Sequence, residues 1–238
     1  MSTIDLNADV GELDPDIDAR ILQVVSSVNI ACGGHAGDEQ SMGRVARIAA
    51  AAGVRIGAHP SYVDRENFGR TRIDTSPTAL IGQLRDQIAA LRSASPAPVA
   101  YVKPHGALYH VAASDPETAR AVVAASDGLA LMGQAGAEYL RIAEAAGLET
   151  ITEGFADRAY TDDGSLVPRT RPGAVLHEEH AVLNQVSRLA RGQVLTITGE
   201  VIEVRAQSLC LHSDTVGAAR LAVRIAAHLR DSGFEIRA

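Results

Sequence analysis

The sequence predicts an α/β fold built on a parallel sheet. Short apolar segments alternate with amphipathic helical stretches along the chain, and a polar loop follows nearly every apolar segment. Strands that alternate with helices imply a parallel sheet. Seven such strands in 238 residues favour a small or incomplete (β/α) barrel. A doubly wound open sheet is the alternative that the pattern leaves open.

The predicted strands are short apolar runs bounded by turn or loop residues. They cover residues 4–8, 28–31, 54–58, 99–102, 129–132, 150–152 and 209–211. Between them, Leu80, Leu84, Ile88 and Leu91 share one helical face, and residues 218–229 show the same period. We expect the whole chain, residues 1–238, to form a single domain, because it contains no linker, repeat or low-complexity tract.

Start and stop signals agree with these helices. Ser76-Pro77 and Asp115-Pro116 each place a capping side chain before a proline suited to the first turn. Gly53, Gly147 and Gly233 stand where glycines end helices. One segment breaks the alternation: residues 193–205 alternate apolar and polar residues around Thr198-Gly199-Glu200, which predicts a β-hairpin insertion.

Composition excludes several classes of protein. A net charge of −7 without a basic cluster argues against nucleic-acid binding. Cys32 and Cys210 lie far apart, unlike the cysteines of a disulfide-stapled secreted domain, and we expect both to be packed thiols. The acidic N-terminus does not resemble a secretory signal, and no apolar run reaches the roughly 18 residues of a membrane span. We therefore expect a cytoplasmic protein.

Chemistry-bearing residues gather where the predicted strands end. His35, His59, His105 and His212 follow four different strands, as does Lys103. Because parallel strands present their carboxyl ends on one face, these side chains are expected to converge there. Lys103 is the one lysine among 22 basic residues, which indicates a site that needs a compact ammonium group.

The first strand carries a polar face. Asp5, Asn7 and Asp9 point to one side by the two-residue period of a strand. Burying two carboxylates is costly, so we expect Lys103, a protonated histidine or a metal beside them. The glycine-rich loop 33–38 is no Walker loop, and the chain contains no such motif. Asp38 is predicted to be the N-cap of the next helix.

Seven motifs occur in an order that resembles one known family. They are DLNADVGE from Asp5, NIACGGHAGD from Asn29, GAHP from Gly57, FGR from Phe68, VKPHGALY from Val102, FADRAY from Phe155 and VPR from Val167. Together they resemble the LamB/YcsF family over nearly the whole chain. The resemblance implies a (β/α)7 barrel similar to the glycoside hydrolase/deacetylase fold.

The resemblance also implies an activity. It implies the ATP-dependent opening of 5-oxo-L-proline to L-glutamate as part of a 5-oxoprolinase, with partner subunits B and C and with ATP as co-substrate bound with those partners. We expect catalytic roles for Lys103, His105, His35, His59 and Asp9. Substrate-binding roles are expected for Asp5, Asn7, Glu12, Asn29, Tyr109, Asp157, Arg158 and His212.

A divalent metal is left open by the sequence. Asp9, His35 and His59 could imitate the Asp and two His of deacetylase-like barrels, although their H-x-x-x-H spacing is absent. Two alternatives remain: a stand-alone metal-dependent amidohydrolase and a non-catalytic scaffold subunit. The chain also departs from the family pattern, with Gly34 in place of phenylalanine, Ser61 in place of glycine, and Ser213 in a His-Gly-Asp motif.

Overall fold

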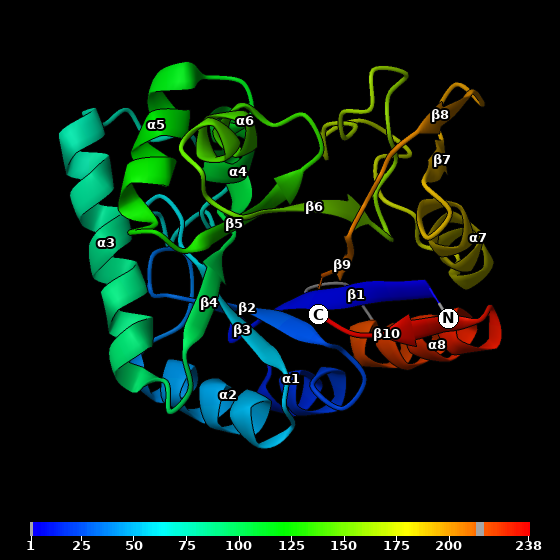
Figure 1. Ribbon diagram of the computed structural model, residues 1–238, viewed down its shortest axis with the longest axis horizontal. Coiled ribbons are helices and arrows are strands. Elements are labelled where there is room, and N and C mark those ends of the chain that lie inside the picture. Colours follow the sequence, from blue (N-terminus) through cyan, green and yellow to red (C-terminus); the bar gives the residue numbers. More distant parts are fainter. Residues whose placement is uncertain (1, 213–216) are drawn as a thin grey trace.

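Seven parallel strands close into a barrel in this computed structural model, which describes residues 2–212 and 217–238. The barrel order is β1 (Ser2–Val10), β2 (Ser27–Ala31), β3 (Arg55–His59), β4 (Val99–Val102), β5 (Ala130–Gln134), β6 (Thr150–Phe155) and β9 (Ser208–Leu211). Pairing of β9 with both β6 and β1 closes the ring (Figure 1). The barrel prediction is confirmed, and the open sheet is excluded.

All seven predicted strands are present, with ends that shift by at most three residues. An eighth parallel strand, β10 (Phe234–Ile236), adds to the outer edge of β1 at Ser2–Ile4. The sequence pattern did not predict it, because three residues are too few to show a period. Ser213 and Asp214, where the chain departs from the family's His-Gly-Asp motif, lie outside the described residues.

Eight helices among the described residues surround the barrel (Figure 1). They are α1 (Pro15–Ile21), α2 (Glu39–Ala51), α3 (Pro77–Ala94), α4 (Gly106–Ala112), α5 (Pro116–Ala125), α6 (Glu138–Ala145), α7 (Glu179–Leu189) and α8 (Ala218–Asp231). The predicted caps are confirmed: the side chains of Asp38, Ser76 and Asp115 accept from backbone N–H groups in the first turns of α2, α3 and α5. Glycines with positive φ follow α2, α6 and α8.

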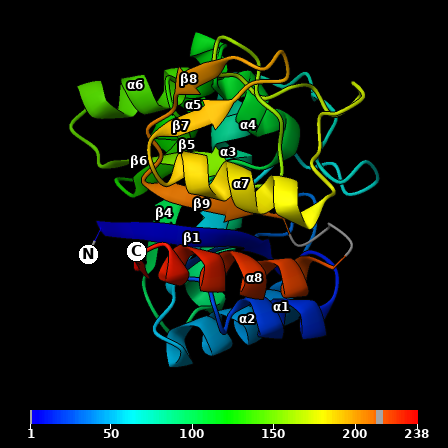
Figure 2. The same ribbon diagram turned by 90° about the vertical axis from the view of Figure 1, so that its right-hand side faces the viewer.

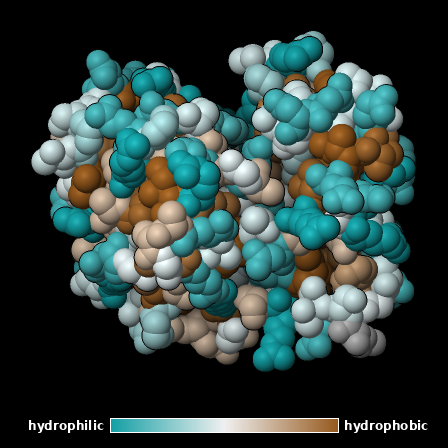
Figure 3. All heavy atoms as spheres, turned by 45° about the horizontal axis from the view of Figure 1, so that its top comes forward, coloured by the Kyte–Doolittle hydropathy of each residue, from teal (hydrophilic) through white to brown (hydrophobic). Residues whose placement is uncertain are grey.

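The predicted hairpin is also confirmed. Strands β7 (Gln193–Leu195) and β8 (Val201–Glu203) pair antiparallel in a separate two-stranded sheet outside the barrel. Leu195, Ile197 and Val201 of this hairpin are exposed. On the face shown in Figure 3, hydrophobic side chains form several separate groups among polar ones. In the part of the chain that is described, no helix is both long and apolar enough to span a membrane.

Polar side chains fill the barrel interior, where branched aliphatic residues are usual. Strand β1 contributes Asp5, Asn7 and Asp9, all buried, as predicted from its period. The buried hydroxyl of Tyr101 donates its hydrogen to Asn29 Oδ1, 2.8 Å away. The ring needs Gly57 beside it on the neighbouring strand, because a Cβ there would lie 2.2 Å from Tyr101 Cε2. The apolar core lies between strands and helices.

Candidate active site

A cavity of about 560 Å³ opens at the carboxyl ends of the strands. In Figure 2, β1 runs from left to right, and the loops that follow the strands lie on the right-hand side. Eight of the predicted site residues line the cavity: Asp9, Glu12, His59, Lys103, His105, Tyr109, Arg158 and His212. His35 and Asp157 lie directly behind lining residues, and each contacts one of them. The predicted convergence of strand ends is therefore observed.

Lys103 stands at the centre of the site and is only 2% exposed. Its Nζ lies 3.0 Å from each of Asp9 Oδ1, Glu153 Oε2 and Cys210 Sγ. Burial opposes the charge of Lys103, but the attraction of the Asp9 and Glu153 carboxylates outweighs burial and raises the pKa of Lys103 well above its usual value. The ammonium group is therefore charged at pH 7, and its three hydrogens face protein atoms.

Two residues around Lys103 were missed as site residues. Glu153 is buried on β6, and its carboxylate meets the lysine. Cys210 was expected to be only a packed thiol, yet its sulfur lies against Nζ. Burial raises the pKa of Cys210 well above the usual value, so a neutral thiol faces the lysine. The sequence did offer one indication for Glu153, because this charged residue directly follows the predicted strand 150–152.

Beside this group, the hydroxyl of Tyr109 is buried close to Glu153. Burial, followed by the negative charge of Glu153, raises the pKa of Tyr109 well above its usual value. The phenol is therefore a neutral hydrogen-bond donor at physiological pH. Its ring packs edge-on against Phe155, 5.8 Å away between centroids.

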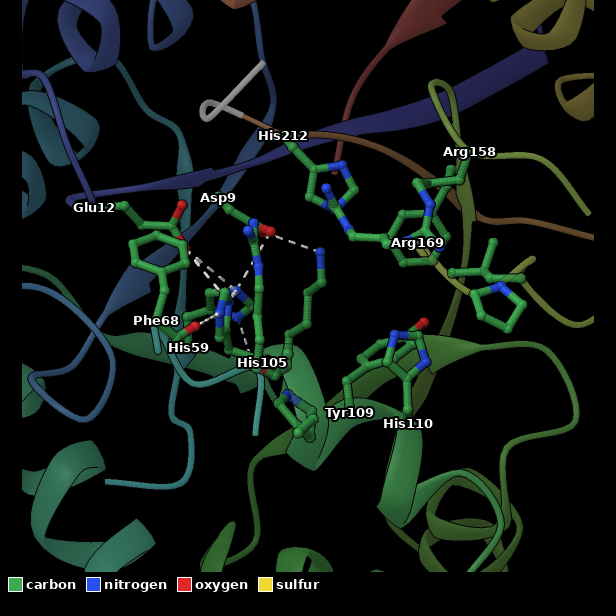
Figure 4. A pocket seen from close by; sticks show the side chains of 18 of the residues that line it. Asp9, Glu12, His59, Phe68, His105, Tyr109, His110, Arg158, Arg169 and His212 are labelled. Carbon is green, nitrogen blue, oxygen red and sulfur yellow. Dashed lines mark hydrogen bonds and ion pairs between the residues drawn. The ribbon is translucent and has the colours of Figure 1, made fainter. Parts of the chain in front are cut away.

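Glu12, His59 and His105 lie on one wall of the cavity (Figure 4), and His35 behind them completes a compact cluster. His59 Nε2 lies 3.0 Å from His105 Nδ1, and His35 Nε2 lies 3.0 Å from Glu12 Oε1. The rings of His35 and His105 stack in parallel, with centroids 3.6 Å apart. Burial lowers the pKa of both His35 and His105 far below the usual value, and repulsion by a neighbouring histidine, His105 for His35 and His59 for His105, lowers it further. Both rings are neutral at pH 7.

Asp9 links this cluster to Lys103. Its Oδ1 accepts from Lys103 Nζ and from Asn29 Nδ2, while its Oδ2 lies 3.4 Å from His59 Nε2. Burial opposes ionisation of Asp9, but His59 and Lys103 outweigh burial and lower its pKa well below the usual value. Asp9 is therefore an ionised carboxylate at the cavity wall.

His212 also lines the cavity, and its ring is held by a carboxylate. His212 Nδ1 lies 3.0 and 3.1 Å from the two oxygens of Asp157, and the ring stacks on Phe155. Because a carboxylate only accepts, the Nδ1 hydrogen is donated to Asp157. When the ring carries this one hydrogen, Nε2 keeps its lone pair. This carboxylate–histidine pair has the geometry of an oriented general base.

Two arginines approach the cavity from the loop after β6 (Figure 4). Arg158 was predicted to bind substrate, but its guanidinium donates to the carbonyls of Val167 and Ala174 and thus braces the loop. Burial, then repulsion by Arg169, lowers the pKa of Arg158 to about 10. Arg169, which the sequence pattern did not single out, is exposed at the cavity rim. It is better placed than Arg158 to meet an anionic ligand.

Three predicted substrate-binding residues lie below the cavity. Asp5 accepts from the hydroxyls of Ser26, Ser27 and Ser208, so hydroxyl donors take the place of the cation or metal expected for it. Asn7 and Asn29 form the next layer: Asn29 Nδ2 donates to Asn7 Oδ1 over 2.7 Å. None of the three lines the cavity. Their polar side chains support Asp9 and Lys103 from beneath.

The departure at Gly34 has a local explanation. A Cβ on Gly34 would lie 2.5 Å from Ser61 Oγ and closer still to Gln87 Oε1. Gln87 fills this space, accepting from Ser61 N and donating to Ser61 O. Gly34 and Ser61, which both depart from the family pattern, therefore lie against each other and against one glutamine.

Within the described residues, two groups have donor atoms close enough for one metal ion. The first is Glu12 with His35, His59 and His105, and the second is Asp9 with Cys210 and His212. The set considered from sequence, Asp9 with His35 and His59, is not one of them. The first group draws on nitrogen and carboxylate donors, which suit a transition-metal ion.

Comparison with known proteins identifies a family for this chain and a solved structure with the same fold. The LamB/YcsF family model matches residues 4–238. The chain is 46% identical over 246 residues to a 5-oxoprolinase subunit of Haemophilus influenzae (strain PittEE), with both chains covered completely. The crystal structure of the lactam utilization protein from Thermus thermophilus is 37% identical, with a TM-score of 0.91 and 99% of both chains covered.

A more distant likeness supports the fold alone. A CE4 family pseudoenzyme from Bacillus anthracis is 16% identical, with a TM-score of 0.52, over 99% of this chain and 63% of the other. This likeness agrees with the predicted similarity to deacetylase barrels. The full-length family match and the relative at 46% identity are decisive. The chain belongs to the LamB/YcsF family.

Proposed function

We propose that this chain is the lactam-opening subunit of an ATP-dependent 5-oxoprolinase, which converts 5-oxo-L-proline to L-glutamate with partner subunits B and C. The full-length relation to a chain named as a 5-oxoprolinase subunit supports this role. The observation that carries it is the His212–Asp157 pair on the cavity wall. A scaffold has no need of an imidazole held by a carboxylate inside a cavity.

The need for partners follows from the chemistry. A five-membered lactam is a stabilised amide, so its hydrolysis must be coupled to ATP. Transfer of a phosphoryl group to the lactam oxygen would give an electrophile that water can attack. Because this chain has no Walker motif, we assign ATP binding to the partners. A cytoplasmic location stays a prediction.

The residues that line the cavity suggest a division of catalytic and binding roles. His212 Nε2 is the candidate to take a proton from the attacking water, with Asp157 holding the ring and stabilising its charged form. Arg169 is the candidate to bind the substrate carboxylate. Tyr109, a neutral donor, is placed to hydrogen-bond the lactam.

Lys103, for which a catalytic role is expected, directs its hydrogens toward Asp9, Glu153 and Cys210. We propose that it keeps Asp9 ionised and fixed. The cavity, at about 560 Å³, also exceeds the needs of a small five-membered lactam, which leaves room for a phosphorylated substrate.

The test is reconstitution. The purified chain is incubated with 5-oxoproline and ATP, with and without subunits B and C, and glutamate and ADP are measured. We expect the chain alone to be nearly inert and the three subunits together to form glutamate. Glutamate formation by the chain with no partner would favour the stand-alone amidohydrolase. Undiminished glutamate formation by the complex containing His212→Asn would favour the scaffold.

A further inference from the structure

Hydrogen-bond partners fix which nitrogen carries the hydrogen in each histidine of the cluster. His59 Nδ1 lies 2.8 Å from the carbonyl oxygen of Lys103, and His105 Nε2 lies 3.0 Å from that of Phe68. A carbonyl only accepts, so each of these nitrogens carries the hydrogen. His35 Nδ1 is buried with no hydrogen-bond partner, whereas its Nε2 faces Glu12. The His35 hydrogen therefore lies on Nε2 and is donated to Glu12.

These assignments leave two lone pairs face to face. His59 Nε2 and His105 Nδ1 are 3.0 Å apart, and the hydrogens assigned above lie on the other nitrogen of each ring. Negative charge surrounds the same point: Glu12 Oε1 lies 3.5 Å from His105 Nδ1 and 4.0 Å from His59 Nε2. Asp9 Oδ2 is 3.4 Å from His59 Nε2. A cation between the donor atoms would meet both lone pairs and both carboxylates at once.

The distances among the donor atoms are close to those expected around a single metal ion. In a tetrahedral zinc site with bonds of about 2.0–2.1 Å, ligand atoms lie about 3.3 Å apart. The three distances among His59 Nε2, His105 Nδ1 and Glu12 Oε1 are 3.0, 3.5 and 4.0 Å. The back nitrogens of both rings donate to backbone carbonyls, which is the usual support of metal-bound histidines.

We propose that Glu12, His59 and His105 bind one divalent transition-metal ion of the zinc class. All three residues line the cavity, so a fourth position faces the ligand space (Figure 4). His35 does not line the cavity and acts as a positioning residue that holds Glu12 through its Nε2–H. Two imidazoles and one carboxylate favour zinc, cobalt or nickel over magnesium and calcium, which prefer oxygen ligands.

This set differs from the one considered from sequence. Glu12 and His105 replace Asp9 and His35 as ligands, because Asp9 Oδ1 is already engaged by Lys103 and Asn29. The inference rests on the geometry of the cluster and holds whatever lactam the protein opens. A bound ion of this class would supply Lewis acidity next to the cavity.

The experiment uses cobalt(II) as a visible probe of the intact chain. Protein freed of metal by a chelator is titrated with CoCl2, without lactam, ATP or partners. We expect ligand-field absorption bands of a low-coordinate cobalt site, saturating at one equivalent and abolished by one equivalent of zinc. Zinc should also raise the thermal unfolding temperature of the metal-free protein by mass action.

Variants test the ligand set. Glu12→Gln, His59→Gln and His105→Gln should each lose the bands, and His35→Gln should weaken cobalt binding about 10–100-fold. His110→Gln is the matched control, since His110 lines the same cavity but lies outside the cluster. It should bind cobalt as the wild type does.

Two results would overturn the inference. One is a wild-type protein that gives neither stoichiometric bands nor a zinc-dependent rise in unfolding temperature, which would mean that a shared proton occupies the cluster. The other is a folded His59→Gln or Glu12→Gln variant that binds cobalt like the wild type. The wild-type measurements decide the question even if a ligand variant fails to fold. Because no lactam is present, failure here leaves the proposed function untouched.

Discussion

Replacement of Lys103 offers the most direct test of the site. We compare Lys103→Arg, which keeps the charge, with Lys103→Met, which keeps most of the length and removes the charge. In the native protein, Nζ lies 3.0 Å from oxygens of both Asp9 and Glu153, with all three side chains buried. Arginine spreads its charge over a planar fork and cannot direct donors to three atoms around one point.

The structure sets the expected magnitudes. At an effective dielectric constant of about 20, each 3.0 Å contact contributes about 5 to 6 kcal/mol before desolvation is subtracted. Removing one partner of a buried pair costs about 3–5 kcal/mol, and we expect that loss of unfolding free energy for Lys103→Met at pH 7. For Lys103→Arg we expect a stable fold and at least a tenfold loss of glutamate formation, a barrier increase of about 1.4 kcal/mol.

The pH dependence provides an internal check. The pKa of Asp9 is lowered in the folded state, so its ionisation stabilises the protein above the unfolded value of about 3.9, and this gain is lost as pH falls through the folded pKa. Lys103→Met removes part of that effect, so its deficit in unfolding free energy should be constant above about pH 5 and shrink as pH falls below about 4 toward the folded pKa of Asp9.

Two measurements suffice: urea unfolding of the isolated variants across this pH range, and glutamate release by the complex with subunits B and C. Wild-type turnover in Lys103→Arg would show that the site does not need an ammonium group at this position. A Lys103→Met variant as stable as the wild type at pH 7 would show that the buried contacts of Lys103 with Asp9 and Glu153 do not stabilise the fold.

Three further predictions concern other parts of the molecule. His212→Asn should lower glutamate release by the complex about 10²–10⁴-fold with unchanged urea unfolding, and a loss below twofold contradicts the assigned base. Gly34→Ala should lower the free energy of unfolding by about 1–3 kcal/mol in urea, because the added methyl group would clash with Ser61 and Gln87. Recovered stability in the Gly34→Ala/Ser61→Gly double variant would locate the clash at Ser61. A Gly34→Ala variant as stable as the wild type would show that the clash does not occur. Burial raises the pKa of Asp18 to about 6, above the unfolded value, so the wild type should lose up to about 3 kcal/mol as pH rises from about 4 to 6 and then level off. Asp18→Asn, which keeps an acceptor for Gly11 N–H, should lack this loss, and parallel stability curves for the two proteins would show that Asp18 does not titrate as stated.

The sequence by itself determined the elements and their order. Strands and helices follow from local periodicity, and the first turns of α2, α3 and α5 follow from the capping residues Asp38, Ser76 and Asp115. The inward face of β1 was also readable, because side chains alternate strictly along a strand. Likewise, the gathering of histidines and Lys103 on one face follows from parallel strands alone.

Only the tertiary structure decided which of these side chains meet. Lys103 contacts Asp9, Glu153 and Cys210, which come from three other strands of the barrel. Those contacts depend on the register of β1 with β9 and of β6 with β9, which closes the ring. Local sequence does not encode that register, because it is set by the packing of the whole barrel.

The same reason explains the residues whose roles changed. Asp5 and Asp9 are equivalent in the sequence pattern of β1, yet Asp5 meets serine hydroxyls and Asp9 meets a lysine. Arg158 and Arg169 are both loop arginines, but burial commits one to backbone carbonyls and leaves the other at the rim. A side chain's position along the barrel axis and its solvent exposure determine its partners, and both are properties of the closed barrel.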